Sequence, residues 1–288
     1  MSKNWFMKFV KNWGSKFPSV PRAIVLAVFC AAFVCVLGVG CEVPLRWEGS
    51  ITPTSTGSGV PTAAQWESVE PGVERLDAKV SAAGAAARVV LWRFSAEADW
   101  TWSLATSTES QSVSGWVDDP QTDVIFAVNA GYFHADGLPS GWVVLDGLRW
   151  GKRAFDEQRS GIVALGARPT VLLGSAPTST VRVDAFQSYP FLIKGGEQAF
   201  PKETGQYARR TFVAVDAEGR WYVGVVPTEP VTLFQLVGLL QSLPVRWERV
   251  LNLDGGPSTG LVTALGGREE RIDSFAPVAF AIVAKRRL

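Results

Sequence analysis

The segment from Asn252 to Ser258 carries polar residues at the end of an apolar run. Asn252 and Asp254 alternate with apolar neighbours, so in a strand their side chains point to the same face. Gly255 and Gly256 allow a ligand to approach the backbone closely, and Ser258 adds a hydroxyl. An ordinary Asp-Gly-Gly turn is the alternative, but buried polar side chains are unfavourable unless they are paired or used. We therefore favour a site here, resembling an anion-binding nest of backbone N–H groups.

Two further motifs place polar groups where apolar strands end. Asn129 begins N-A-G-Y-F after an apolar run, and Gly141 precedes the apolar segment that ends at Asp146–Gly147. Each motif has a structural alternative, because Asn, Asp and Gly are also the residues that turns require. Asn129 and Asp146 are thus candidates for a site or for turns.

Arg209, Arg210 and Thr211 open a strand that is otherwise apolar. An arginine at the start of a strand is suited to bind phosphate or carboxylate, because its planar guanidinium donates two parallel hydrogen bonds. A solvated charge at a sheet edge is the alternative.

Several common catalytic arrangements are missing from the sequence. His134 is the single histidine, and no Gly-x-Ser-x-Gly segment supplies a nucleophilic serine. No Cys or His pair has the spacing of metal ligands, so we predict neither a metal site nor a cofactor.

Short β-type segments must position these residues. Apolar, branched and aromatic residues predict strands at 87–94, 100–106, 124–133, 142–150, 161–167, 171–175, 250–256 and 277–284, and a hairpin at 209–227 with Gly219 in its turn. One segment, 232–243, has helical periodicity, with Thr232 and Gln235 at capping-box spacing and Pro244 after it. The sequence predicts a single α+β domain, over 66–288, with a mixed, mostly antiparallel β-sheet and a few helices.

The N-terminal part differs from this body. Residues 1–22 contain five cations and no acid, residues 23–40 form an uncharged apolar run, and residues 41–65 are rich in Ser, Thr, Gly and Pro. We expect a cytoplasmic basic segment, a transmembrane or signal helix, and a flexible tether that leaves the body facing the periplasm or cell exterior. The segment 37–41, L-G-V-G-C, also resembles a lipoprotein processing site, so a retained helix and a lipid on Cys41 both remain open.

The charge balance argues against nucleic acid as a partner. The whole chain has 28 basic and 27 acidic residues, and five of the basic residues lie in 1–22, so 23 basic and 27 acidic residues remain, a net charge of −4. Phosphate backbones are bound by clustered cations, and a body with net negative charge does not favour such binding. The cysteines all precede residue 42, so the body contains no disulfide.

Taken in order, the motifs resemble those of the phosphodiester glycosidase family. They are N-A-G-Y-F at 129–133, G-W-V-V-L-D-G at 141–147, Y-P-F-L-I-K-G-G at 189–196, R-R-T-F-V-A-V-D at 209–216 and L-N-L-D-G-G-P-S-T at 251–259. The resemblance covers about 75–284 and implies one cavity lined by Asn129, Gly131, Phe133, Gly141, Asp146, Gly147, Arg210, Thr211, Asn252, Asp254, Gly255, Gly256 and Ser258.

The resemblance implies hydrolysis of a sugar–phosphate bond at the anomeric carbon of a glycosyl phosphodiester, on an envelope or extracellular glycan. Such cleavage passes through an oxocarbenium-like state assisted by carboxylates, for which Asp254 and Asp146 are the candidates. Arg210 and the backbone at Gly255–Gly256 are expected to stabilise the leaving phosphate. A surface module that binds polysaccharide without cleaving it is the alternative, because aromatics, Asn and Asp serve sugar binding equally well.

Overall fold

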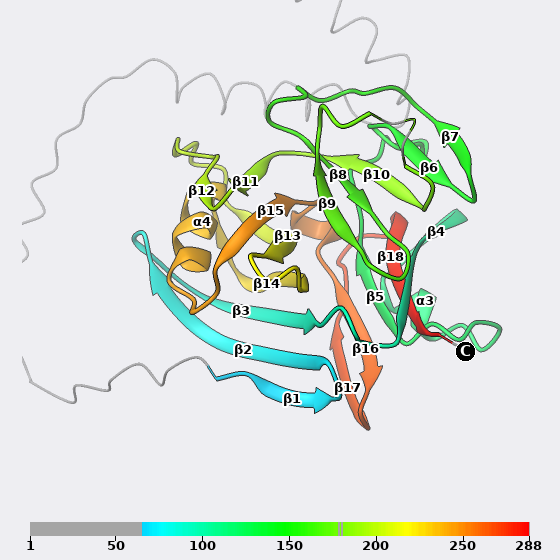
Figure 1. Cartoon of the computed structure of the whole chain (residues 1–288), viewed down its shortest axis with the longest axis horizontal. Helices are drawn as coiled ribbons and strands as arrows, with labels where there is room; N and C mark the ends of the chain where they lie inside the picture. Colours follow the sequence, from blue (N-terminus) through cyan, green and yellow to red (C-terminus); the bar gives the residue numbers. More distant parts are fainter. Residues whose placement is uncertain (1–64, 178, 180, 288) are drawn as a thin grey trace, which may run out of the picture. The chain divides into compact units, whose positions relative to one another are not determined.

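A computed structural model describes residues 65–177, 179 and 181–287, in which antiparallel strands predominate (Figure 1). The largest sheet runs in the order β1 (Glu67–Glu70), β2 (Val73–Ala82), β3 (Ala85–Phe94), β14 (Trp221–Val231), β13 (Ala208–Asp216), β15 (Trp247–Asn252), β11 (Phe191–Lys194) and β12 (Glu197–Gln198). We call it the large sheet.

Two five-stranded sheets complete the domain. One runs β7 (Leu148–Trp150), β6 (Val143–Leu145), β10 (Ala185–Ser188), β8 (Gly161–Ala164) and β9 (Thr170–Leu173). The other runs β17 (Arg268–Ile272), β16 (Leu261–Leu265), β5 (Phe126–Asn129), β18 (Val278–Arg286) and β4 (Trp100–Gln111). The helical elements are α3 (Ser114–Val117), α4 (Leu233–Gln241) and a 3₁₀ turn at Gly256–Ser258.

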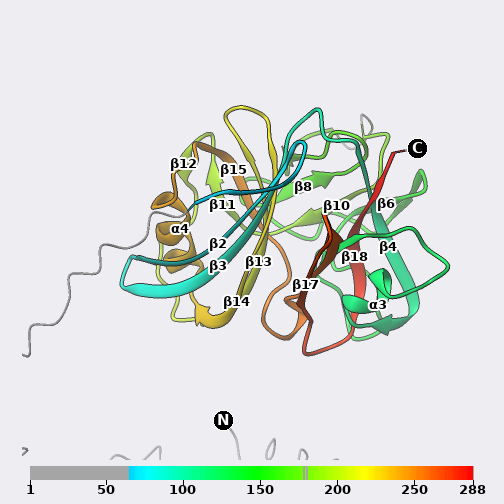
Figure 2. The same ribbon diagram turned by 90° about the horizontal axis from the view of Figure 1, so that it is seen from below.

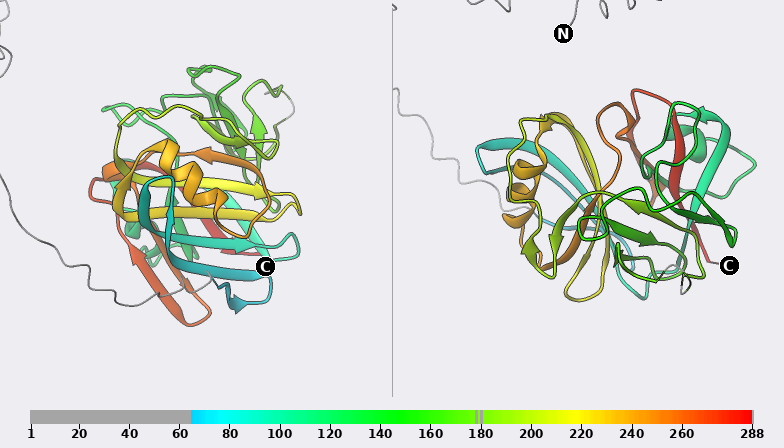
Figure 3. Two further views of the ribbon diagram at one scale, coloured as in Figure 1. Left: turned by 90° about the vertical axis from the view of Figure 1, so that its left-hand side faces the viewer. Right: turned by 90° about the horizontal axis from the view of Figure 1, so that it is seen from above.

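The central strands of the large sheet are buried on both faces. In β13, Phe212 packs into the core beneath α4, whereas Val213 packs into the core shared with the other sheets. Figures 2 and 3 show α4 on one side of β13 and β14 and the β18 strand on the other. Burial on both faces explains why Phe212–Val215 of β13 and Trp221–Val226 of β14 contain no charged residue and do not alternate with polar ones, since neither face meets water.

The predicted helix and hairpin are confirmed. Thr232 caps α4: its hydroxyl accepts the Gln235 N–H at 3.1 Å, and the Gln235 side chain accepts the Thr232 N–H at 3.1 Å. Gly219, in the turn between β13 and β14, has φ of 78°, a left-handed conformation that glycine adopts without strain. The antiparallel sheets, the few helices and the single domain are confirmed as well.

The structure corrects one expectation, and another lies outside the described residues. The segment 142–150, predicted as one strand, is the hairpin of β6 and β7. The basic segment, the apolar run 23–40 and nearly all of the tether lie outside the described residues, so membrane attachment stays a prediction. Within the described part of the chain, no helix is long and apolar enough to cross a membrane.

A buried ion pair joins the large sheet to the sheet of β5 and β18. Arg75 on β2 donates from Nε to Glu270 on β17 at 2.8 Å, and the Trp92 indole N–H donates to the same carboxylate at 3.0 Å. Both charged residues are buried, and the pair extends to Asp77, which accepts from Arg75 Nη2 at 2.7 Å. This contact helps to fix the relation between the two sheets whose ends form the site.

Candidate active site

The end of β15 is held by three separate segments. The N–H groups of Asn252, Leu253 and Asp254 donate to the carbonyls of Pro190 at 3.0 Å, Thr211 at 2.9 Å and Ala130 at 3.2 Å, respectively. The motifs at 129–133, 189–196, 209–216 and 251–259, distant in sequence, therefore meet at one end of the large sheet.

Asn129 is the buried side chain that ties these motifs together. Its Nδ2 donates to the Asp254 carbonyl at 2.7 Å, and its Oδ1 accepts the Thr211 hydroxyl at 2.8 Å and the Gly260 N–H at 3.1 Å. Because the amide is occupied by protein groups and buried, Asn129 and Thr211 position the Asp254 turn and do not face a ligand.

Asp254 presents a half-buried carboxylate at this turn. The Gly255 N–H donates to its Oδ1 at 2.9 Å, and the Ser258 side chain is also hydrogen-bonded to it. Burial raises the pKa of Asp254, and the two hydrogen bonds only partly oppose this. A desolvated carboxylate of raised pKa is a stronger base than one in water.

The glycines of this turn are required by its geometry. A Cβ on Gly255 would lie 2.8 Å from the Arg209 carbonyl oxygen, closer than a carbon atom can approach. Gly256 has φ of 61° and begins the 3₁₀ turn that ends at Ser258. The predicted residues Gly255 and Gly256 thus allow the turn to pass close to β13 and to project Asp254.

Arg210 lies buried at the start of β13 without a carboxylate in contact. Its Nε donates to the Val231 carbonyl at 2.9 Å and its Nη2 donates to the Gln206 carbonyl. Among the described residues, no group accepts a hydrogen bond from its Nη1, and no ion pair involves it. Burial lowers the pKa of Arg210, while Tyr132 and Glu203 oppose this shift. The guanidinium stays charged and has donors left for an anion.

Tyr132 was not among the predicted site residues, although it lies within the motif 129–133. Its hydroxyl donates to the Tyr189 carbonyl at 3.0 Å and accepts from Asn252 Nδ2 at 2.6 Å. Burial and then the charge of Asp254 raise the pKa of this phenol, and the charge of Arg210 lowers it. Tyr132 thus joins the motif 129–133 to the motifs 189–196 and 251–259.

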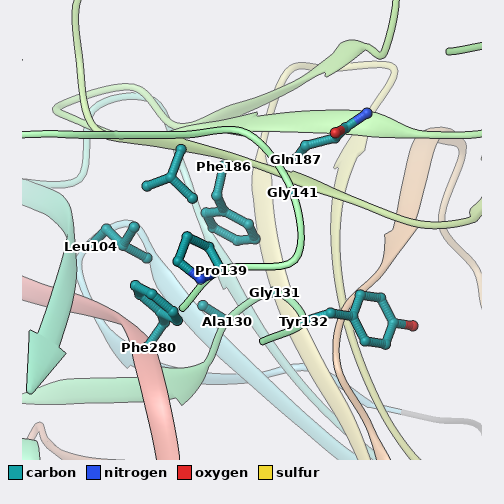
Figure 4. A pocket seen from close by; sticks show the side chains of 10 residues that line it. Leu104, Ala130, Gly131, Tyr132, Pro139, Gly141, Phe186, Gln187 and Phe280 are labelled. Atoms are coloured by element: carbon teal, nitrogen blue, oxygen red, sulfur yellow. The ribbon is translucent and has the colours of Figure 1, made fainter. Parts of the chain in front are cut away.

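Gly131, Gly141 and Phe133 have packing roles. Gly131 and Gly141 line a cavity of about 10 Å³, from which the Tyr132 ring points away (Figure 4). A Cβ on Gly131 would lie 2.9 Å from the Phe186 ring, and one on Gly141 would lie 3.2 Å from the Gln187 carbonyl oxygen. Phe133 packs against the core. A cavity of this size holds at most about one water molecule, so it is not a sugar pocket.

The structure places Asp146 in a hairpin turn, where its N–H donates to Asp184 Oδ1 at 3.0 Å. Asp146 and Gly147 form the exposed turn between β6 and β7, with φ of 51° and 75°. Two left-handed residues in succession are what a type I′ hairpin turn requires, and Asp-Gly is a preferred pair for it. The turn accounts for the Asp-Gly pair at 146–147, and Asp254 is the candidate carboxylate that lies where the motifs meet.

Removal of the Asn129 amide should destabilise the domain more than removal of its Thr211 partner. Asn129→Ala leaves the Asp254 carbonyl and the Gly260 N–H buried and unpaired, and we expect a loss of about 3 kcal/mol in the free energy of unfolding. Thr211→Val removes one of these hydrogen bonds, and we expect a loss of about 1 kcal/mol. Urea unfolding measures both, and equal losses would contradict the central position of Asn129.

The pKa of Asp254 predicts a pH-dependent stability. A carboxyl whose folded pKa lies above its ordinary value of 3.8 favours the folded state at lower pH, and this contribution is lost as pH rises through the folded pKa. Asp254→Asn removes the buried charge, so its melting temperature should exceed that of the parent at pH 7, and the difference should close below pH 3.8. The exposed Asp146→Asn serves as the control. A parent protein more stable than Asp254→Asn at pH 7 would show that the buried charge of Asp254 does not destabilise the fold.

The domain is similar to known proteins, in sequence to one family and in fold to solved structures. A family model described as phosphodiester glycosidase matches residues 122–285. The catalytic domain of zebrafish N-acetylglucosamine-1-phosphodiester alpha-N-acetylglucosaminidase, auto-inhibited by its pro-peptide, has a TM-score of 0.57 at 17% identity, over 78% of this chain and 87% of that one. A hypothetical protein from Synechocystis has a TM-score of 0.52 at 17% identity, over 78% of this chain.

The chain spans 64% of the length of the Synechocystis protein, less than two thirds. No curated protein matches the sequence. At 17% identity the two solved structures show a shared fold alone. The family model, however, matches more than half of the chain and includes Asn129, Arg210 and Asp254. This chain belongs to the phosphodiester glycosidase family.

Proposed function

We propose that the domain hydrolyses glycosyl phosphodiesters at the anomeric carbon, with an envelope or extracellular glycan as substrate. The family supports a glycosidase that acts on phosphodiesters. The name of the zebrafish relative describes action on an N-acetylglucosamine 1-phosphodiester, which is consistent with this substrate class.

The observation that carries the proposal is the state of Arg210. A buried guanidinium normally has a carboxylate partner, since an unpaired buried charge is unfavourable. Arg210 contacts two carbonyls, and among the described residues no carboxylate contacts it. An anionic substrate group supplies the missing partner, and a phosphodiester presents two non-bridging oxygens to the free guanidinium donors.

Asp254 acts at the other end of the bond that breaks. The bond between the anomeric carbon and the phosphate oxygen breaks, and the phosphate monoester leaves with the electron pair. Water supplies the hydroxyl of the free sugar, and its other proton passes to the phosphate monoester. The Asp254 carboxylate stabilises the positive charge that develops at the anomeric carbon. The leaving phosphate is a weak base, so Arg210 assists its departure by charge stabilisation and no strong general acid is needed.

We also propose that the domain is exported and attached to a membrane, by the helix 23–40 or by a lipid on Cys41. Five cations precede the apolar run, and no cysteine follows residue 41. When the outer layer of the cells is permeabilised and the inner membrane stays closed, added protease should degrade the domain. Protection of the domain until the inner membrane is opened would contradict export.

The reaction is tested by its products. A panel of glycosyl phosphodiesters that share one aglycone and differ in the sugar should yield free sugar and a phosphate monoester. A binding module without activity would yield neither product while retaining affinity for the sugar. Release of a sugar phosphate would instead indicate cleavage on the other side of phosphorus.

Arg210 and Asp254 should have separable roles. Arg210→Lys keeps the charge but loses the planar pair of donors, so cleavage of phosphodiesters should fall far more than cleavage of an activated neutral glycoside. Asp254→Asn should lower kcat for both substrates by about 10² or more, because it removes the group that acts at the sugar carbon.

The exposed Arg246→Lys is the matched control and should leave both rates unchanged. Equal loss of both activities in Arg210→Lys, or parental rates in Asp254→Asn, would contradict the assigned roles.

A further inference from the structure

Phe275 is a large apolar side chain that stands almost free in solvent, beside the Asp254 turn. It is 79% exposed, the highest value among the large hydrophobic residues of the described chain. A single exposed phenylalanine is common on protein surfaces. What needs an explanation is the set of contacts that holds the Phe275 ring and its loop in place.

The loop that carries Phe275 is fixed on both sides. Asp273 accepts the Ser114 hydroxyl at 2.6 Å, and Ser274 accepts the Val113 N–H at 3.3 Å. The N–H groups of Phe275 and Ala276 donate to the Pro257 carbonyl at 2.8 and 3.1 Å. An exposed ring on a rigid loop loses little conformational entropy when it binds a ligand.

Arg209 supports the ring from below. The carbon at the centre of its guanidinium lies 4.0 Å from the centroid of the Phe275 ring, within the range of a cation–π contact. Its Nε donates to the Pro227 carbonyl at 2.7 Å and its Nη2 to the Asp273 carbonyl at 3.3 Å, while Nη1 is buried without a partner. A buried N–H without a partner is unfavourable, so the two hydrogen bonds of Arg209 do not by themselves explain the position of its guanidinium. The contact with the Phe275 ring is the further interaction at this position. It fixes one face of the ring and leaves the other open.

Contacts connect Phe275 to the site. Pro257, whose carbonyl holds the Phe275 loop, follows Asp254 by three residues in the same turn, and Gly255 lies against the Arg209 carbonyl. Arg210 instead bonds to Val231 and Gln206, next to α4. The Asp254 turn therefore contacts the Phe275 loop through Pro257 and lies against β13 at Arg209.

We propose that Phe275, held by Arg209, is a stacking platform for the pyranose ring of the sugar that is released. The proposal rests on the proposed function and extends it to the substrate. With the phosphate at Arg210 and the anomeric carbon at Asp254, the sugar extends towards Phe275. The C–H face of a pyranose is apolar and flat enough to cover the free face of the ring, and its edge hydroxyls stay in water.

The test compares Phe275→Ala, Phe275→Trp and the matched control Trp150→Ala. Trp150 is an exposed aromatic residue on β7, 41% exposed, outside the site. Phe275→Ala should raise KM for a pyranosyl phosphodiester about tenfold, with kcat changed little. Phe275→Trp should restore KM, and Trp150→Ala should leave it unchanged. A parental KM in Phe275→Ala would overturn the proposal.

A binding measurement separates this proposal from the proposed reaction. Saturation-transfer NMR with the methyl α-pyranosides of glucose, galactose, mannose and N-acetylglucosamine should show transfer to at least one sugar in the parent. The transfer should be lost in Phe275→Ala and kept in Phe275→Trp and Trp150→Ala. This pattern without turnover of any phosphodiester would support the platform and reject the reaction. Absence of transfer in the parent, or equal transfer in Phe275→Ala, would overturn the platform.

Discussion

The hydrogen bonds of the Asn129 amide are the constraint on which the site depends. Asn129 joins the end of β5 to the Asp254 carbonyl, the Thr211 hydroxyl and the Gly260 N–H. The hydrogen bond to the Asp254 carbonyl restrains the backbone from which the Asp254 side chain projects. The residue that makes this bond lies more than a hundred positions away in the chain. The same contacts bring the turn against β13, where Arg210 begins its strand.

Arg210 and Asp254 are stabilised less well than the buried pair of Arg75 and Glu270. Arg75 and Glu270 are buried as a hydrogen-bonded pair, whereas Arg210 is buried with carbonyls alone and Asp254 has its pKa raised by burial. Buried charge without a full complement of partners is unfavourable to folding and useful for binding an ion of opposite sign. This contrast within one domain distinguishes the site from the ion pairs that support the fold.

Local signals in the sequence predicted some features and missed others. The capping box at Thr232 and the Gly219 turn depend on residues close in sequence, and both are confirmed. The role of Asp146 was ambiguous in the sequence, because an Asp-Gly pair serves a hairpin as well as a site, and the structure shows the hairpin turn. Strand β10 was missed because Gln187 and Ser188 interrupt its apolar pattern, although both are buried and paired with other segments.

The residues missed in the site share a different cause. Tyr132 gains its place from contacts with Asn252 and Tyr189, and Phe275 from Arg209 and Pro257, all distant in the chain. The alternation of Asn252 and Asp254 is visible in one sequence, but such long-range contacts are set by the packing of three sheets. A motif thus indicates the strand ends that meet, and the structure shows which side chains face each other.

The central claim is that the bond to the anomeric carbon breaks while the bonds of phosphorus stay intact. Hydrolysis of a pyranosyl phosphodiester in water enriched in ¹⁸O, followed by mass spectrometry of both products, tests it most directly. The account predicts the label in the free sugar and none in the phosphate monoester. Label in the phosphate product would place the attack at phosphorus and contradict the account.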